Sequence, residues 1–170
     1  MSVTLHTTKG DVKLQLHCRE APRSCANFLA LCAAGAYDAC PFHRVSSGFI
    51  AQTGDPTGTG KTSRAAFAKR LPDEIVPALT FARPGVVAFA NNGRPSRKGV
   101  GSQFFITVKP ATHLDATCTV VGAVIWGLAV VNAISEAEAE NGTPRVQIKI
   151  ESVTIHANPF ATGDLEFQLP

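Results

Sequence analysis

Short segments in which apolar and polar residues alternate recur along this chain, and turn-forming residues separate them. Residues 2–8 and 11–17 alternate in this way on either side of Lys9-Gly10-Asp11. A period of two residues places every second side chain on the same face of a strand, and glycine supplies the positive φ that a tight turn needs. The first 17 residues are therefore predicted to form a β-hairpin.

Strand-like segments continue through the rest of the chain. Residues 42–52 are predicted to form two short strands, interrupted near Ser46-Ser47-Gly48. Further apolar or alternating runs of strand length lie at 85–90, 103–108, 120–124 and 146–155. Residues 54–80 are rich in Gly, Thr and Pro and are expected to be mostly loop.

Two segments instead have the character of helices. Four apolar residues fall at i, i+3, i+4 and i+7, which is one face of an amphipathic helix: Cys25, Phe28, Leu29 and Cys32. Pro22 is tolerated in a first helical turn, and Gly35 is a common stop. A second helix is expected at residues 128–135. Many short strands, two helices and no strand–helix alternation predict a mostly β fold, a closed antiparallel barrel.

The bulk composition fits one domain of this kind. The chain has 170 residues, of which 45% are hydrophobic and 17% charged, so a sizeable core is available and global disorder is excluded. A net charge of +3 is too small to indicate a nucleic-acid or membrane binder by itself. Neither nucleic acid nor membrane is expected as a direct partner.

The cysteines and the start of the chain predict an intracellular protein, in the cytoplasm, the nucleus or both. No basic-then-apolar signal opens the sequence, and the weakly polar run 118–131 is shorter than the ~18–20 residues of a membrane span. Five cysteines without a C-x-x-C pair argue against a disulfide framework or a zinc site. Buried free thiols and no metal are expected. Residues 161–170 are expected to form a loose tail behind a single domain at 1–160.

Gly58-Thr-Gly60-Lys61-Thr62 resembles part of a phosphate-binding P-loop. That motif needs a glycine at the position of Asp55, so that backbone N–H groups wrap the phosphates. A carboxylate there would repel a phosphate, and Gly54 lies one residue too early. Nucleotide binding is therefore not expected.

The most distinctive block is Phe42-His-Arg-Val-Ser-Ser-Gly-Phe-Ile-Ala-Gln-Thr-Gly-Asp55. It is followed by Phe89-Ala-Asn-Asn-Gly93, by Gly101-Ser-Gln-Phe-Phe-Ile106 and by His113-Leu-Asp115. In this order the blocks resemble the cyclophilin family of peptidyl-prolyl cis–trans isomerases, over Ser2 to about Ala161. The ends of the chain look most like the short single-domain members associated with the spliceosome. The resemblance implies an eight-stranded antiparallel barrel capped by two helices, and proline-containing peptides or proteins as substrates.

The chemistry of prolyl isomerisation explains why such a site needs an arginine. Rotation about X-Pro is slow because amide resonance must be broken. In the twisted transition state the nitrogen lone pair can accept a hydrogen bond, so a fixed cation there stabilises the transition state more than the planar ground state. Arg44 matches the catalytic arginine of the family, and Gln52, eight residues on, is predicted to orient it. The alternative for Arg44 is a surface arginine in an ordinary salt bridge.

The resemblance also implies a peptide-binding groove. The positions that match the proline pocket and its surroundings are Phe49, Ile50, Ala90, Asn91, Asn92, Gln103, Phe105, His113, Leu114 and Cys118. Asn91 matches the residue whose backbone pairs with the extended peptide. For the aromatic residues, plain core packing is the alternative interpretation. No cofactor is required, because no bond is broken and no electron moves.

Several positions depart from the usual family pattern. His113 stands where many members carry Trp, Cys118 where they carry His, and Ile50 where they carry Met. The resemblance brings cyclosporin to mind as an inhibitor, and these changes predict that it binds weakly. They also leave open a second function, a proline-peptide binding module in an RNA-processing complex with little catalytic role.

Basic residues are expected near the outer part of the groove. The family motifs place Lys69 and Arg70 there, and a loop that is longer than usual adds Arg94, Arg97 and Lys98. Two interpretations stay open for these charges. They form either an ordinary solvated surface or a rim that favours acidic peptides.

Overall fold

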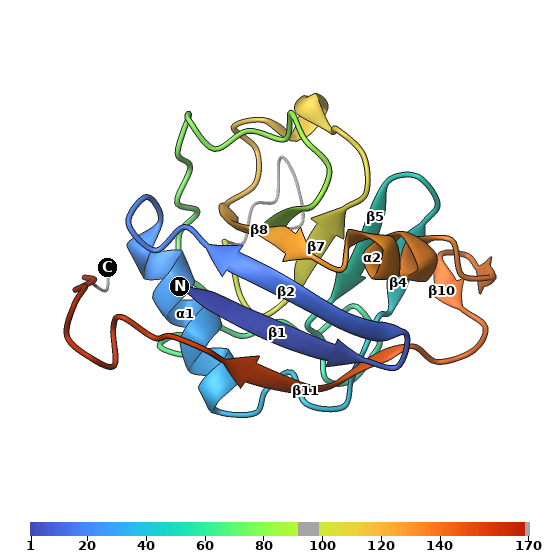
Figure 1. The fold of residues 1–170 in the computed structure, drawn as a ribbon, viewed down its shortest axis with the longest axis horizontal. Coiled ribbons are helices and arrows are strands. Elements are labelled where there is room, and N and C mark those ends of the chain that lie inside the picture. Colours follow the sequence, from blue (N-terminus) through green and yellow to red (C-terminus); the bar gives the residue numbers. More distant parts are fainter. Residues whose placement is uncertain (92–98, 169–170) are drawn as a thin grey trace.

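The computed structural model describes residues 1–91 and 99–168, and one curled antiparallel sheet dominates it (Figure 1). The order of its nine strands is β3-β11-β1-β2-β8-β6-β7-β5-β4. These strands are β1 (Ser2–Thr7), β2 (Gly10–Leu16), β3 (Cys40–Pro41), β4 (Arg44–Ser46), β5 (Ile50–Thr53), β6 (Val86–Phe89), β7 (Phe104–Thr107), β8 (Val120–Trp126) and β11 (Lys149–Ile155). The predicted mostly β fold is confirmed.

The predicted N-terminal hairpin is formed by β1 and β2. Ser2 pairs with Gln15 and Thr7 with Gly10, so the turn lies at Thr8-Lys9. Gly10 has φ +125°, and a β-carbon there would lie 3.2 Å from Val130 Cγ2. Glycine is therefore required by its backbone conformation, and any side chain would also press on the second helix.

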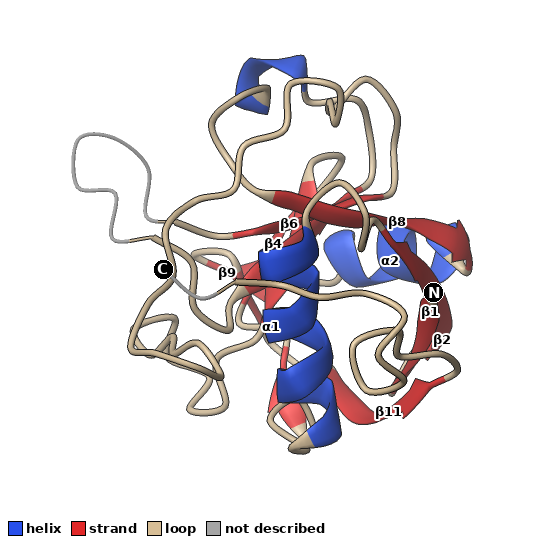
Figure 2. Cartoon of the chain, turned by 90° about the vertical axis from the view of Figure 1, so that its left-hand side faces the viewer, coloured by secondary structure: helices blue, strands red, loops and turns tan. Residues whose placement is uncertain are grey.

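Two helices lie at opposite ends of the sheet, α1 (Pro22–Ala33) and α2 (Leu128–Ser135) (Figures 1 and 2). Both agree with the predicted helices, and Pro22 lies in the first turn of α1. The predicted apolar face of α1 is buried, including Cys25 and Phe28. Among the described residues no helix has the length and apolar character needed to cross a membrane.

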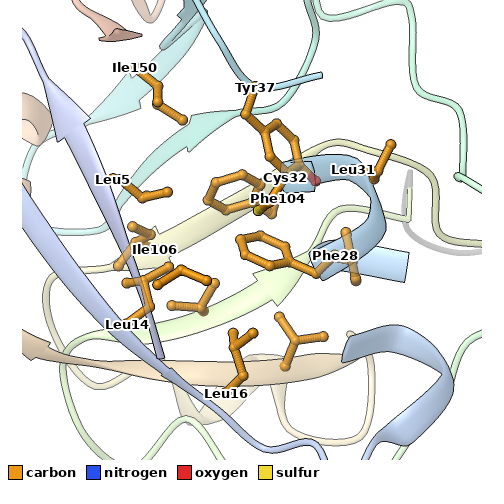
Figure 3. Close-up of a cluster of buried hydrophobic side chains, with 14 of the residues drawn as sticks. Leu5, Leu14, Leu16, Phe28, Leu31, Cys32, Tyr37, Phe104, Ile106 and Ile150 are labelled. Atoms are coloured by element: carbon orange, nitrogen blue, oxygen red, sulfur yellow. The ribbon is translucent and has the colours of Figure 1, made fainter. Parts of the chain in front are cut away.

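The main core lies between α1 and the concave face of the sheet. Side chains from β1, β2, β7 and β11 point toward Phe28 and Tyr37, as Figure 3 shows for Leu5, Leu14, Ile106 and Ile150. The ring centroids of Phe28 and Phe104 are 5.2 Å apart, in an edge-to-face arrangement. Burial of each such side chain contributes about 1.5–3 kcal/mol.

The strand count differs from the eight that the resemblance implied. The two-residue strand β3 pairs with β11, which makes nine strands. The sheet order begins at β3 and ends at β4, which do not pair, so the predicted closed barrel is corrected to a curled, open sheet in the described residues. Two further elements were not predicted, namely the small hairpin of β9 (Ala139–Glu140) and β10 (Thr143–Pro144), and the 3₁₀ helix η1 (Thr112–Leu114). Elements of two or three residues are too short to show a hydrophobic period.

All five cysteines are free thiols, as predicted, but only four of them are buried. Burial raises the pKa of Cys32 well above its usual value, so this thiol stays protonated and unreactive. Cys118 is half-buried, which corrects the expectation of full burial for this residue.

The segment after β11 is held more firmly than a loose tail. Leu165 packs against the main core, and its N–H donates to the Pro159 carbonyl at 3.1 Å. The ring of Phe167 lies 5.5 Å from that of Phe160 and 5.1 Å from that of Phe67. Aromatic contacts therefore fasten the described part of the tail to the loop that carries Phe67.

Candidate active site

Arg44 and Gln52 lie side by side because β4 and β5 form an antiparallel pair. Arg44 is directly opposite Gln52, and Val45 is opposite Ala51. Strand alternation buries Val45 and Ala51 and leaves Arg44 exposed on the other face. In the described residues Arg44 makes no ion pair, so the alternative of an ordinary salt bridge finds no support there.

A pocket with a volume of about 470 Å³ opens in front of this pair. Its lining consists of Arg44, Phe49, Ile50, Gln52, Ala90, Asn91, Phe105, His113, Leu114, Thr117 and Cys118. Ten of these residues were predicted from the sequence. They come from β4, β5, β7, the end of β6 and the segment around η1, which the curled sheet brings together.

The floor of the pocket is apolar and fixed. Ile50 and Phe105 belong to a second hydrophobic cluster, in which the rings of Phe81 and Phe105 stack 6.1 Å apart. At the rim, the rings of Phe49 and His113 lie 5.5 Å apart. Packing and pocket lining are thus not alternatives for Phe105, because it does both. A slot of this kind suits an apolar ring.

Gln103 lies behind the pocket and does not line it. It is buried, and its Oε1 accepts a hydrogen bond from Gln52 Nε2 at 3.1 Å. Its Nε2 donates to the carbonyls of Gly60 and Thr62, at 3.0 and 2.9 Å. The amide of Gln103 therefore connects Gln52 to the loop that follows β5.

Asn91 is held at the edge of the groove by its side chain. Its Nδ2 donates to the carbonyl of Thr117 at 2.7 Å and to Asp73 Oδ1 at 3.1 Å. Asp73 also accepts a hydrogen bond from the Thr119 hydroxyl. These bonds position the backbone of Asn91 beside the pocket. Asn92, the next predicted groove residue, lies outside the described residues.

Thr117 lines the pocket but was not predicted. Its hydroxyl donates to the Leu114 carbonyl at 2.6 Å, which closes the turn between two predicted pocket residues, Leu114 and Cys118. A threonine in a turn has no distinctive sequence signal. Its place between two matched positions was the one available clue.

His43, next to Arg44, is buried within the protein. Burial lowers its pKa below the usual value, so the ring is neutral at pH 7. Its Nδ1 has no hydrogen-bond partner among the described residues. A neutral His43 adds no positive charge next to Arg44.

No group of three or more His, Cys, Asp or Glu side chains able to hold a metal ion occurs among the described residues. Beside the apolar slot, the polar groups of the pocket are the exposed Arg44 guanidinium, the Gln52 and Asn91 amides, the His113 imidazole, the Thr117 hydroxyl and the Cys118 thiol. The guanidinium and the amides are suited to bind and polarise a substrate.

Comparisons with known proteins agree with this arrangement. The family model described as cyclophilin type peptidyl-prolyl cis-trans isomerase/CLD matches residues 2–155. Peptidyl-prolyl cis-trans isomerase-like 3 of Mus musculus is 47% identical over 163 residues, which cover 95% of this chain and 99% of the mouse protein. Peptidyl-prolyl cis-trans isomerase 10 of Caenorhabditis elegans is 48% identical over 162 residues, with the same shares of both chains.

A solved structure shows the same fold. The crystal structure of a Cryptosporidium parvum cyclophilin type peptidyl-prolyl cis-trans isomerase, in the presence of the dipeptide Ala-Pro, superposes with a TM-score of 0.88 at 36% identity. The match covers 93% of this chain and 100% of the parasite chain. The family match, the relatives and the fold lead to one conclusion: the chain belongs to the cyclophilin-type peptidyl-prolyl cis–trans isomerases.

Proposed function

We propose that the chain accelerates rotation about X-Pro bonds of protein substrates, with Arg44 as the catalytic residue. The proline ring occupies the apolar slot above Ile50 and Phe105. The Arg44 guanidinium then lies beside the prolyl nitrogen and donates to its lone pair once amide resonance is lost. A charge-assisted hydrogen bond contributes about 1.5–3 kcal/mol, which corresponds to roughly ten- to a hundred-fold in rate.

The single observation that carries this proposal is the pairing of Arg44 with Gln52 on the wall of an apolar pocket. Gln52 lies opposite Arg44 on the neighbouring strand, and its proposed role is to orient the guanidinium. Gln103 holds Gln52 by a hydrogen bond. The backbone of Asn91 is the proposed partner of the extended peptide. Orientation of this kind lowers the entropic cost of reaching the transition state.

A second candidate function is proline-peptide binding within an RNA-processing complex, with spliceosomal proteins as partners. The observation that favours it is the changed pocket wall, where His113 and Cys118 replace the usual residues of the family. Under this second function, the protein acts by binding proline-containing peptides and not by isomerising them. Under either function the intracellular location expected from the sequence stays a prediction.

We also propose that cyclosporin binds weakly. His113 is exposed and forms the outer wall of the slot with Phe49. An imidazole offers less apolar surface than an indole and costs more to dehydrate. The wall of the pocket is therefore less favourable for a large apolar ligand.

A prolyl isomerase assay on a short Ala-Pro-Phe peptide tests the proposed function. Arg44→Ala is expected to lower kcat/KM at least ten-fold, with an unchanged circular dichroism spectrum. Arg145→Ala is the matched control, because Arg145 is exposed, pairs with Glu138 at 3.4 Å and is not among the residues that line the pocket. Near-normal turnover by folded Arg44→Ala contradicts the mechanism. Tight peptide binding without turnover by the wild type favours the binding module.

A further inference from the structure

A second pocket, next to the loop that Gln103 holds, is lined mostly by basic residues. Its volume is about 670 Å³, against about 470 Å³ for the proline pocket. The lining residues are Lys61, Thr62, Ser63, Arg64, Lys69 and Arg70. Four of the six carry a positive charge at pH 7. We define this set as the basic pocket.

The charge of the basic pocket is not neutralised within the described structure. None of its four cations makes an ion pair with a described residue. The carboxylates of the same region are engaged elsewhere. Asp55 is buried under its own loop, Glu74 accepts the N–H of Ser24, and Asp73 accepts from Asn91. The positive potential of the pocket is therefore directed at solvent.

The backbone that forms the pocket is fixed to the barrel. Ser63 Oγ accepts the N–H groups of Ser102 and Gln103, at 3.0 and 3.1 Å. The N–H of Ala66 donates to Asn27 Oδ1 at 2.8 Å. A β-carbon on Gly101 would lie 2.4 Å from Ser63 Oγ, so glycine there permits the close approach. The cationic side chains thus project from a preorganised frame, which lowers the cost of binding.

Gln103 separates the basic pocket from the proline pocket. It bonds on one side to Gln52, which lines the proline pocket, and on the other to Thr62, which lines the basic one. The path from Gln52 Nε2 through the Gln103 amide to the Thr62 carbonyl oxygen is at most roughly 8 Å long. This is the length of two to three residues of extended peptide. The linings of the two pockets therefore lie close enough for one extended peptide to occupy both.

We propose that the basic pocket binds an anionic side chain of the substrate, a carboxylate or a phosphate, within about three residues of the proline. The inference rests on the proposed function, because the proline pocket sets the register of the peptide. Arg64 presents a planar guanidinium that binds such oxygens in a bidentate manner. Arg70 donates from one guanidinium nitrogen to the Gly99 carbonyl at 3.3 Å and has further N–H donors for the ligand. Single-stranded RNA is a less suitable ligand, because no aromatic ring for base stacking lines the pocket.

The experiment compares peptides that share one Pro and differ at a single position, scanned from three residues before the proline to two after it. Each position carries Glu, phosphoserine, Ala or Lys. At low salt the Glu peptide is expected to exceed the Lys peptide in kcat/KM by about five-fold at one or two positions, and phosphoserine by about ten-fold. At 0.5 M salt the ratios are expected to fall below about two.

Two double variants that each remove two positive charges test whether the basic pocket causes the preference for anionic peptides. The double variant Arg64→Gln/Lys69→Gln is expected to bring all ratios near one while leaving turnover of the Ala peptide within two-fold. The control Lys9→Gln/Arg19→Gln removes two exposed cations elsewhere and is expected to keep the preference. Equal loss in both variants assigns the preference to net charge and overturns the proposal.

Two further measurements distinguish failure of the proposed function from failure of the basic-pocket proposal. Turnover of the Ala peptide reports the proposed function alone, and fluorescence anisotropy of labelled Glu and Lys peptides measures the charge preference even without turnover. Equal dissociation constants for the two peptides in the wild type overturn the basic-pocket proposal while isomerase activity stands. A uridine oligonucleotide that binds more tightly than the phosphopeptide, and depends on Arg64 and Lys69, reassigns the pocket to RNA.

Discussion

At the scale of single residues, the side chain of Gln103 shapes the site although it does not line the proline pocket. Its carbonyl oxygen holds Gln52 and its nitrogen holds the loop at Gly60 and Thr62. The oxygen and the nitrogen of the Gln103 side-chain amide are thus both engaged in hydrogen bonds. Gln103 is a positioning residue, because it acts on the Arg44–Gln52 pair through a hydrogen bond and not through the substrate.

Gln103→Leu tests this role. The change keeps similar volume but removes the bond to Gln52, a loss of about 1 kcal/mol, so kcat is expected to fall about three- to ten-fold with little change in KM. Gln15→Leu, at an exposed glutamine of β2, is the control for a change of Gln to Leu. Steady-state kinetics on a Pro-containing peptide distinguish positioning from binding, since a purely binding residue would raise KM and leave kcat unchanged.

His113→Trp tests the shape of the outer wall. An indole in place of the imidazole adds apolar area opposite Phe49, so the affinity for cyclosporin is expected to rise several-fold, about 1 kcal/mol. Isothermal titration calorimetry of the wild type and the variant measures the change. Equal dissociation constants would show that position 113 does not limit cyclosporin binding.

The site residues differ in how far the sequence could predict them. Arg44, Gln52 and Phe105 stand in distinctive blocks, so their positions followed from the resemblance and the structure gathers them. The link between the two pockets through Gln103 could not be predicted, because it depends on side-chain hydrogen bonds between β5, β7 and a loop that shows no hydrophobic period. Thr117 was missed because a threonine in a turn has no distinctive sequence signal.

At the scale of elements, length decided what could be predicted. β1, β2 and α1 span six to twelve residues and carry a clear period of two or 3.6. β3 and the β9–β10 hairpin consist of two-residue strands whose pairing depends on tertiary neighbours. The tail shows the same limit. Its terminal position indicated a loose end, whereas Phe167 packs against an aromatic ring 100 positions earlier, that of Phe67.

The tail contact predicts a coupling between two elements. Phe67 belongs to the loop that carries Arg64 and Lys69, and Phe167 packs on it. Phe167→Ala removes an aromatic pair that contributes about 0.5–1.5 kcal/mol beyond area burial. Amide hydrogen exchange in residues 63–70 is therefore expected to quicken several-fold, while the strands β1 and β2 stay protected. Glu166→Ala is the exposed control, and unchanged exchange in both variants would show that the tail does not steady the loop.

At the scale of the whole molecule, the buried carboxylate of Asp55 holds together the start of the long loop that follows β5. Asp55 Oδ1 accepts the N–H and the hydroxyl of Thr57, at 2.8 and 2.7 Å. Its Oδ2 accepts the N–H of Thr62 at 3.1 Å and the Thr59 hydroxyl at 3.2 Å. Two of these donors are backbone N–H groups, the kind that a P-loop offers to a phosphate, and here they bind the Asp55 carboxylate.

The electrostatics of Asp55 give the fold a dependence on acid. Burial alone would raise the pKa of this carboxyl, but the hydrogen bonds from Thr57, Thr62 and Thr59 outweigh it and lower the pKa below its usual value. A carboxyl whose pKa is lower in the folded state than in the unfolded state stabilises the fold above the unfolded pKa, about 3.9. That stability is lost as the pH falls through the folded pKa.

Asp55→Asn is therefore expected to lower the free energy of unfolding at pH 7 by about 1–3 kcal/mol, because an amide cannot accept all four bonds. The deficit relative to the wild type is expected to shrink between about pH 5 and pH 2, where the wild-type carboxylate becomes protonated. Urea unfolding at pH 7, 5, 4 and 3 measures it, with Asp38→Asn, at an exposed aspartate, as the control. His43 is present in both the wild type and the variant, so its own titration cancels from the difference between them. A deficit that stays constant from pH 7 to pH 3 would show that protonation of Asp55 is not what weakens the fold in acid.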